Sequence, residues 1–277
     1  MRTLQLPSGQ SISVLGMGTW RMGERKRDRQ GEIAALRHGL ELGLSLIDTA
    51  EMYGEGGAED VIAEAITTRR QEVFLVSKVY PHNASKQGAI AACERSLKRL
   101  QTNYLDLYLL HWRGSVPLAE TLDAFQTLQR QGKIRSYGVS NFDVDDMEEA
   151  MTLSGGEAIA TNQVLYNLQR RGVEVNLLPW CRQRGIPVMA YSPIEQGRLL
   201  NEPTLKAIAN ERNVTTAQVA IAWLLHQPDV IVIPKSSNIA HVEQNYATLD
   251  LKLTEAELAM LDKAFPAPTH PTPLAML

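Results

Sequence analysis

Four side chains that can exchange protons or donate hydrogen bonds stand at the ends of apolar segments. Asp48 and Tyr53 lie together in "LIDTAEMYG", Lys78 ends "VFLVSK", and His111 ends "LDLYLLH". A phenol can protonate an oxygen on which negative charge develops, and an imidazole can donate a hydrogen bond to a carbonyl. The set therefore predicts protonation of a carbonyl oxygen, with the source of electrons still missing.

The acidity of Tyr53 is expected to depend on Lys78. A phenol ordinarily has a pKa of about 10. An ammonium ~4 Å away contributes roughly 4 kcal/mol at an effective dielectric of ~20. At ~1.4 kcal/mol per unit, that interaction lowers the phenol pKa by about 3 units. Asp48 is expected to pair with Lys78 and to keep it charged despite burial.

Each of these residues also has a simpler interpretation. The aspartate can cap a helix, the tyrosine can be an amphipathic residue of a rim, the lysine can reach solvent, and the histidine can be a core residue. Taken singly, each simpler interpretation is preferable. Four such coincidences at one face of one fold are improbable, so we favour the catalytic interpretation.

The segments that carry these residues belong to an alternating pattern of apolar runs and helical periodicity. Most runs lack polar alternation, which is typical of strands covered on both faces. Thr215 with Gln218, and Thr254 with Glu257, predict capping boxes at two helix starts. Eight units in about 250 residues predict an α/β fold, a (β/α)8 TIM barrel whose catalytic residues lie at the C-terminal ends of the strands. The eight runs are 13–18, 44–49, 73–78, 105–111, 134–140, 158–164, 187–192 and 230–235.

Two terminal segments complete the predicted barrel. The first residues are expected to form an N-terminal β-hairpin that turns at Ser8 and Gly9. The proline-rich residues 264–277 are expected to form an extended tail that lies over the barrel. Because no linker or shift of composition interrupts the chain, we expect residues 1–277 to form a single barrel domain.

Composition argues against several classes of protein. The 28 basic and 31 acidic residues give a net charge of −3, so neither nucleic acid nor a membrane is an expected partner. No run approaches the ~18 apolar residues of a membrane span, and no signal segment opens the chain, so we expect a cytoplasmic protein. Cys93 and Cys181 stand in no motif and are interpreted as buried, inert thiols. The six histidines form no ligand-like pairs, so no metal is expected.

The chain resembles the aldo-keto reductase family over nearly its whole length. The matching segments are "GMGTW", "LIDTAEMYG", "VFLVSKV", "YLDLYLLHW", "GVSNF", "NQVLYN", "MAYSP" and "VIPKS", the last followed by "QN". The resemblance implies NADPH-dependent reduction of an aldehyde or ketone, with the nicotinamide as the hydride source. It implies that Tyr53 is the general acid and that Asp48 and Lys78 tune it. His111 would orient the carbonyl.

The resemblance also implies the positions that bind the cofactor. Gly18, Thr19 and Trp20 of the first loop would approach the cofactor. Ser140, Asn141 and Gln163 would hold the carboxamide. Tyr191 would stack on the nicotinamide. A loop would follow the pyrophosphate, and the segment "KSSN" would hold the adenosine end, where barrels commonly bind phosphate. The implied residues are Gly18, Thr19, Trp20, Ser140, Asn141, Gln163, Tyr191, Ser192, Pro193, Ile194, Gln196, Gly197, Arg198, Lys235, Ser236, Ser237, Asn238, His241, Gln244 and Asn245.

One of these positions departs from the family. Many NADPH-using members have arginine six residues after the lysine of "IPKS", where it binds the 2′-phosphate, but this chain has His241. Histidine lacks the bidentate fork of arginine. Lys235, Ser236 and Ser237 remain, so NADPH is still expected over NADH. His241 is expected to contact the phosphate, with stacking on adenine or exposure to water as the alternative.

The expected substrate is a small carbonyl compound. The segment that follows His111 is short, as is the tail, which implies an open pocket lined by Trp20, Tyr80 and Trp112. The pattern looks most like bacterial aldehyde reductases of the methylglyoxal-reducing type. We expect a monomer or a weak homo-oligomer.

Three alternatives remain beside this interpretation. A dinucleotide-binding sheet would need G-x-G-x-x-G, whereas "GMGTWRMG" has four residues before its last glycine. A Schiff-base lyase would need a neutral Lys78, which Asp48 opposes. A regulatory subunit of the same fold binds cofactor without turnover, but here all four catalytic positions are present.

Overall fold

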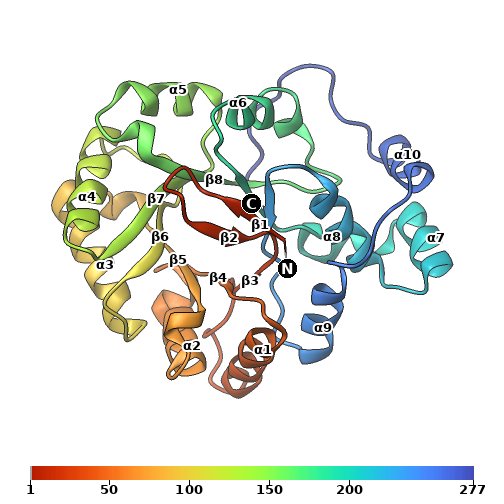
Figure 1. Cartoon of the computed structure of the whole chain (residues 1–277), viewed down its shortest axis with the longest axis horizontal. Helices are drawn as coiled ribbons and strands as arrows, with labels where there is room; N and C mark the ends of the chain where they lie inside the picture. Colours follow the sequence, from red (N-terminus) through yellow and green to blue (C-terminus); the bar gives the residue numbers. More distant parts are fainter. Residues whose placement is uncertain (1) are drawn as a thin grey trace.

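A short antiparallel hairpin opens the chain, as predicted, and closes one end of a barrel. The computed structural model describes residues 2–277, in which β1 (Thr3–Gln5) pairs with β2 (Ser11–Ser13). The turn between them contains Gly9, whose φ of 82° is readily adopted by glycine. Leu6 and Ile12 pack into the apolar cluster inside the barrel. Figure 1 shows this hairpin lying across the centre of the ring of strands.

Eight parallel strands form the barrel, each hydrogen-bonded to the next in chain order, which confirms the predicted fold. Parallel bridges between Leu15 and Val232 and between Gly18 and Lys235 join the first strand to the last. The predicted run 13–18 is divided, because Ser13 pairs in the hairpin and the barrel strand begins three residues later. The strands are β3 (Gly16–Gly18), β4 (Leu46–Asp48), β5 (Phe74–Val79), β6 (Leu105–Leu110), β7 (Ile134–Ser140), β8 (Ile159–Leu165), β9 (Val188–Tyr191) and β10 (Val230–Val232).

Helices surround these strands (Figure 1). Both predicted capping boxes are present: Thr215 caps α8 and Thr254 caps α10, each through the backbone N–H three residues on. Gly43, with a φ of 95°, ends α1. The helices are α1 (Arg29–Leu42), α2 (Gly57–Ile66), α3 (Lys86–Arg99), α4 (Leu118–Arg130), α5 (Val144–Thr152), α6 (Leu177–Gln183), α7 (Pro203–Arg212), α8 (Thr216–His226), α9 (Ile239–Ala247) and α10 (Glu255–Ala264).

The apolar core has two parts because each strand is covered on both faces. One cluster fills the barrel with side chains from alternate strand positions, including Leu46, Val76 and Leu107. A larger cluster lies between the strands and the helices. Strand residues buried on both faces explain the continuous apolar runs in the sequence. No helix within residues 2–277 has the length and apolarity needed to cross a bilayer.

The residues after α10 form an extended tail that returns to the barrel. Thr272 packs so closely on Gly172 that a Cβ there would collide with the threonine hydroxyl. Leu274 packs against the larger core cluster. The tail also lines a cavity together with the segments after β7 and β8. These contacts hold residues of the tail against the rest of the chain.

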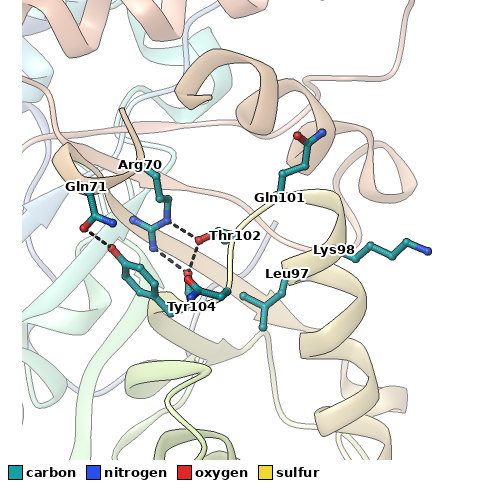
Figure 2. Close-up of a pocket in the computed structure, with 8 residues that line it drawn as sticks. Arg70, Gln71, Leu97, Lys98, Gln101, Thr102 and Tyr104 are labelled. Carbon is teal, nitrogen blue, oxygen red and sulfur yellow. Dashed lines mark hydrogen bonds between the residues drawn. The ribbon is translucent and has the colours of Figure 1, made fainter. Parts of the chain in front are cut away.

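A surface hollow at the N-terminal ends of β5 and β6 is part of the scaffold. Figure 2 shows Arg70 in this hollow, donating hydrogen bonds to the Thr102 hydroxyl at 3.0 Å and to the Tyr104 carbonyl at 2.8 Å. Arg70 also forms a salt bridge with Asp106 at the start of β6. These residues precede or begin β5 and β6, so the hollow lies far from the ends where catalytic residues of a barrel are found.

Candidate active site

Three adjacent strands bring the four candidate catalytic residues together. β4 pairs with β5, and β5 with β6. Asp48 is the last residue of β4, Lys78 the penultimate residue of β5, and His111 follows β6. Tyr53 begins a 3-10 turn (Tyr53–Gly56) that returns toward β5 through left-handed residues, two of them glycines.

Lys78 lies at the centre of this group and is completely buried. Its Nζ donates to Oδ2 of Asp48 at 2.8 Å, to the Thr49 carbonyl at 2.8 Å and to the Tyr53 hydroxyl at 3.3 Å. Burial lowers the pKa of Lys78, and the Asp48 carboxylate opposes that shift. An ammonium has three N–H donors, and these three contacts provide an acceptor for each of them.

The expected acidification of Tyr53 is wrong for this structure. Burial, and then the negative charge of Asp48, raise the pKa of the Tyr53 phenol well above its usual value of 10.0. The physical reason is that a phenolate here would lose its hydration and face a carboxylate, and these effects exceed the attraction of the neighbouring ammonium. The phenol therefore stays protonated throughout the neutral pH range.

His111 is held as a neutral imidazole beside the phenol. The rings of His111 and Tyr53 meet edge-on, with centroids 5.7 Å apart. Burial, with the charge of Lys78, lowers the pKa of His111 to about 2. Within residues 2–277, no hydrogen-bond partner contacts its enclosed Nδ1. A neutral ring carries one N–H, so the ring can donate from Nε2 if that nitrogen carries the proton.

A buried polar cluster adjoins the catalytic group at the ends of β7 to β9. Asn141 donates to the His111 carbonyl and to the Ser140 hydroxyl, both at 3.1 Å. The Tyr191 hydroxyl donates to Oδ1 of Asn141 at 3.0 Å. Burial raises the pKa of Tyr191 to about 12, although a hydrogen bond from the backbone of Leu277 opposes the shift. The tail therefore ends beside this cluster.

Gln163 joins this cluster to the catalytic group, a link that the sequence did not predict. Its Nε2 donates to Oδ1 of Asp48 at 2.8 Å, although 115 residues separate the two. The Ser140 hydroxyl donates to the Gln163 carbonyl at 2.8 Å. Each strand end is a recognisable sequence feature, but a contact across the barrel mouth is not encoded in spacing.

The loop after β9 is held in a conformation that costs backbone energy. Ser192, Glu195 and Gln196 have φ between 50° and 55°, a left-handed region that few non-glycine residues adopt. Asn167 donates to the Ser192 carbonyl and to the buried carboxylate of Glu195. Arg198 donates to the same carboxylate at 3.1 Å. Asn167 and Glu195, which were not among the expected site residues, therefore fix the loop predicted to follow the pyrophosphate.

The predicted adenosine segment lies where the barrel closes. Lys235 pairs with Gly18 across the closure and approaches the Ser237 hydroxyl. Asn238 accepts from the backbone N–H of His241 and so caps α9. The His241 side chain is exposed, whereas Asn245 is buried. The segment thus offers an amine, hydroxyls and an exposed imidazole beside a helix start.

Two of the three predicted substrate residues meet next to His111. Tyr80 and Trp112 contact edge-on with centroids 5.1 Å apart, and Trp112 lies 4.9 Å from His111. Trp20 is 39% exposed and packs beneath the guanidinium of Arg21. Seven residues separate β6 from α4, so the predicted short segment is confirmed.

The chemistry of these side chains fits a nicotinamide adenine dinucleotide phosphate. Ser140 and Asn141 offer hydrogen-bonding groups suited to a carboxamide, Tyr191 offers an aromatic face, and Lys235 offers a cation for phosphate. Within residues 2–277, no group of three or more histidine, cysteine or acidic side chains is arranged to hold a metal ion. Cys93 and Cys181 are buried, and burial raises the pKa of each thiol to about 12.

Comparison with known proteins gives one family. The model of the "Aldo/keto reductase family" matches residues 14–265. Methylglyoxal reductase YeaE of Escherichia coli is 56% identical, with 100% of this chain and 99% of the relative covered. Glyoxal reductase of Bacillus subtilis is 33% identical over 94% of this chain and 91% of its own length.

Solved structures give the same result. An aldo/keto reductase from Klebsiella pneumoniae in complex with NADP and acetate has a TM-score of 0.97 and 50% identity, covering 99% of both chains. An aldo-keto reductase from the same organism in complex with NADPH also has a TM-score of 0.97 and 50% identity, covering 100% of this chain and 99% of its own.

Proposed function

We propose that this chain, which belongs to the aldo/keto reductase family and is an NADPH-dependent oxidoreductase, reduces small aldehydes and ketones such as methylglyoxal to alcohols. The names of the relatives from E. coli and B. subtilis support a small dicarbonyl substrate. The Klebsiella complexes support NADPH as the cofactor.

The observation that carries the chemistry is the contact of one buried ammonium with both a carboxylate and a phenol. Lys78 donates to Asp48 and to Tyr53 within a group that also includes His111. When bound, NADPH supplies the hydride for carbonyl reduction. The residues of the chain then have to orient the carbonyl, exclude water and deliver one proton.

Tyr53 is assigned as the proton donor. Its raised pKa keeps the phenol protonated before the reaction. A carbonyl oxygen that gains an alkoxide charge is far more basic than a phenolate, so transfer from the phenol to that oxygen is favourable. Lys78 donates a hydrogen bond to the phenol oxygen and stabilises the negative charge that remains after transfer.

His111 is assigned as the residue that orients the carbonyl. Its low pKa keeps the ring neutral, so it donates a hydrogen bond without competing as an acid. We infer that the proton lies on Nε2, because the enclosed Nδ1 has no acceptor in contact. Two donors, the phenol and the imidazole, would then converge on one substrate oxygen.

The contacts of Lys78 argue against a Schiff-base lyase. A Schiff-base lysine must be neutral and free to attack a carbonyl. Here the amine is completely buried and donates to three acceptors, one of them a carboxylate. The retention of this arrangement also argues against a purely regulatory subunit, which would not need a proton donor.

The test is NADPH oxidation by the purified protein with a panel of carbonyl compounds. We expect turnover with methylglyoxal and other small aldehydes, and weaker turnover when NADH replaces NADPH. Absence of turnover across the panel, with NADPH binding retained, would favour a regulatory subunit. Borohydride trapping of a substrate adduct on Lys78 would support the lyase instead.

A further inference from the structure

We propose that Glu51 is a positioning residue that sets the aromatic wall of the carbonyl pocket and thereby selects small substrates. The inference rests on the proposed carbonyl reduction, and it concerns a residue between Asp48 and Tyr53 that has no part in the proton transfer. Its side chain is only 7% exposed. A buried carboxylate is costly unless its oxygens are hydrogen-bonded, so its partners identify what it holds.

Those partners lie in the segment after β5. One oxygen, Oε1, accepts from the backbone N–H of Tyr80 at 2.8 Å and from Nδ2 of Asn83 at 3.0 Å. The other, Oε2, lies 3.5 Å from the guanidinium of Arg95 on α3. The backbone N–H of Glu51 donates to the Lys78 carbonyl at 3.3 Å. Glu51 thus joins the loop that carries Tyr53 to the turn at residues 80–83.

That turn supports the wall of the pocket. The Tyr80 ring contacts Trp112 with centroids 5.1 Å apart, and Trp112 contacts His111. Pro81, the next residue, packs on the segment after β6 so closely that a Cβ on Gly114 would lie 2.7 Å from its own Cβ. A shift of the turn would therefore move both aromatic rings beside the residue that orients the carbonyl.

Loosening the aromatic wall should affect small and bulky substrates differently. With the wall fixed, a small carbonyl compound is held against His111 by close contacts. With the wall loosened, a small substrate loses these contacts, whereas a bulky aromatic aldehyde can still fill the wider pocket. The proton donor and the cofactor-binding residues are untouched, so the effect should fall on KM rather than on kcat.

The experiment compares Glu51→Ala with Glu51→Gln. Alanine leaves the N–H of Tyr80 and the amide of Asn83 without their acceptor, so KM for methylglyoxal should rise about tenfold while kcat changes less than about threefold. The ratio of kcat/KM for methylglyoxal to that for 4-nitrobenzaldehyde should fall to about a tenth of its wild-type value. Glutamine keeps an acceptor oxygen and should restore both values. Glu55→Ala, an exposed change in the same loop, should behave as wild type.

A second measurement does not depend on turnover. The contribution of Trp112 to acrylamide quenching is the difference between each protein and the same protein with Trp112→Phe added. The quenching constant of Trp112 should roughly double in Glu51→Ala and not in Glu51→Gln. An unchanged substrate ratio and unchanged quenching in folded Glu51→Ala would overturn the inference, as would an equal loss of kcat with every carbonyl. If the wild type reduces no carbonyl but quenching still responds, the proposed function fails while the positioning of the wall by Glu51 stands.

Discussion

The amine of Lys78 lies 3.3 Å from the hydroxyl of Tyr53, and this contact joins two residues that are 25 positions apart in the chain. Burial raises the pKa of the phenol despite the nearby cation. The ammonium is therefore better placed to stabilise the phenolate formed during the reaction than to ionise the phenol beforehand. The proposed roles of these side chains lead to distinct expectations for substitutions.

Tyr53→Phe should reduce carbonyl turnover by about 10²–10⁴-fold, the usual contribution of a general acid. The ring is retained, so its contact with His111 and the fold should persist. NADPH binding, followed by quenching of protein fluorescence, should remain close to wild type. Turnover within a few-fold of wild type would exclude Tyr53 as the proton donor.

Lys78→Met should impair turnover at least as strongly as Asp48→Asn. The lysine contacts the phenol directly, whereas the aspartate acts through the lysine. Asp48→Asn should also lower the free energy of unfolding, because it leaves a buried ammonium less well paired. The check is kcat for both variants beside their urea unfolding curves. A Lys78→Met enzyme that is more active than Asp48→Asn would contradict the assignment.

The neutral state of His111 should appear in the pH dependence of stability. The unfolded chain gains a proton at this residue near pH 6.5, whereas the folded chain gains it only at about pH 2. The unfolded state therefore binds more protons between these values, and stability falls as the pH drops below 6.5. Between pH 7.5 and pH 5, the wild type should lose about 2 kcal/mol more than His111→Asn. Equal losses in urea unfolding would show that the imidazole is not held neutral.

His241→Arg should tighten NADPH binding and leave NADH binding unchanged. The His241 side chain is exposed in the first turn of α9, and an imidazole lacks the bidentate fork with which arginine holds a phosphate. Arginine can bind the 2′-phosphate with two N–H groups, and NADH has no such phosphate, so only the affinity for NADPH should change. Parallel titrations of both cofactors with both proteins provide the measurement. A preference of the wild type for NADH would rule out the expected phosphate contact.

Local patterns in the sequence were sufficient for the barrel and for the catalytic candidates. Parallel strands buried on both faces appear as continuous apolar runs, and the first polar residue after such a run marks the strand end where a barrel has its catalytic face. Asp48, Lys78 and His111 were recognisable for this reason. The capping boxes at Thr215 and Thr254 were recognisable because their partners lie only three residues away.

Only the tertiary structure decided the interactions that depend on distance and burial. The sequence placed a lysine near a tyrosine but not the degree of desolvation, so it predicted a lowered phenol pKa where burial raises it. The bond from Gln163 to Asp48 joins strand ends 115 residues apart, and the contacts of Glu51 join two loops. Sequence spacing predicts the face of a strand or helix on which a residue lies, because that face depends on the local backbone. Which groups meet across the barrel mouth, and how much water they lose, depends on closure of the sheet and on packing of the loops above it.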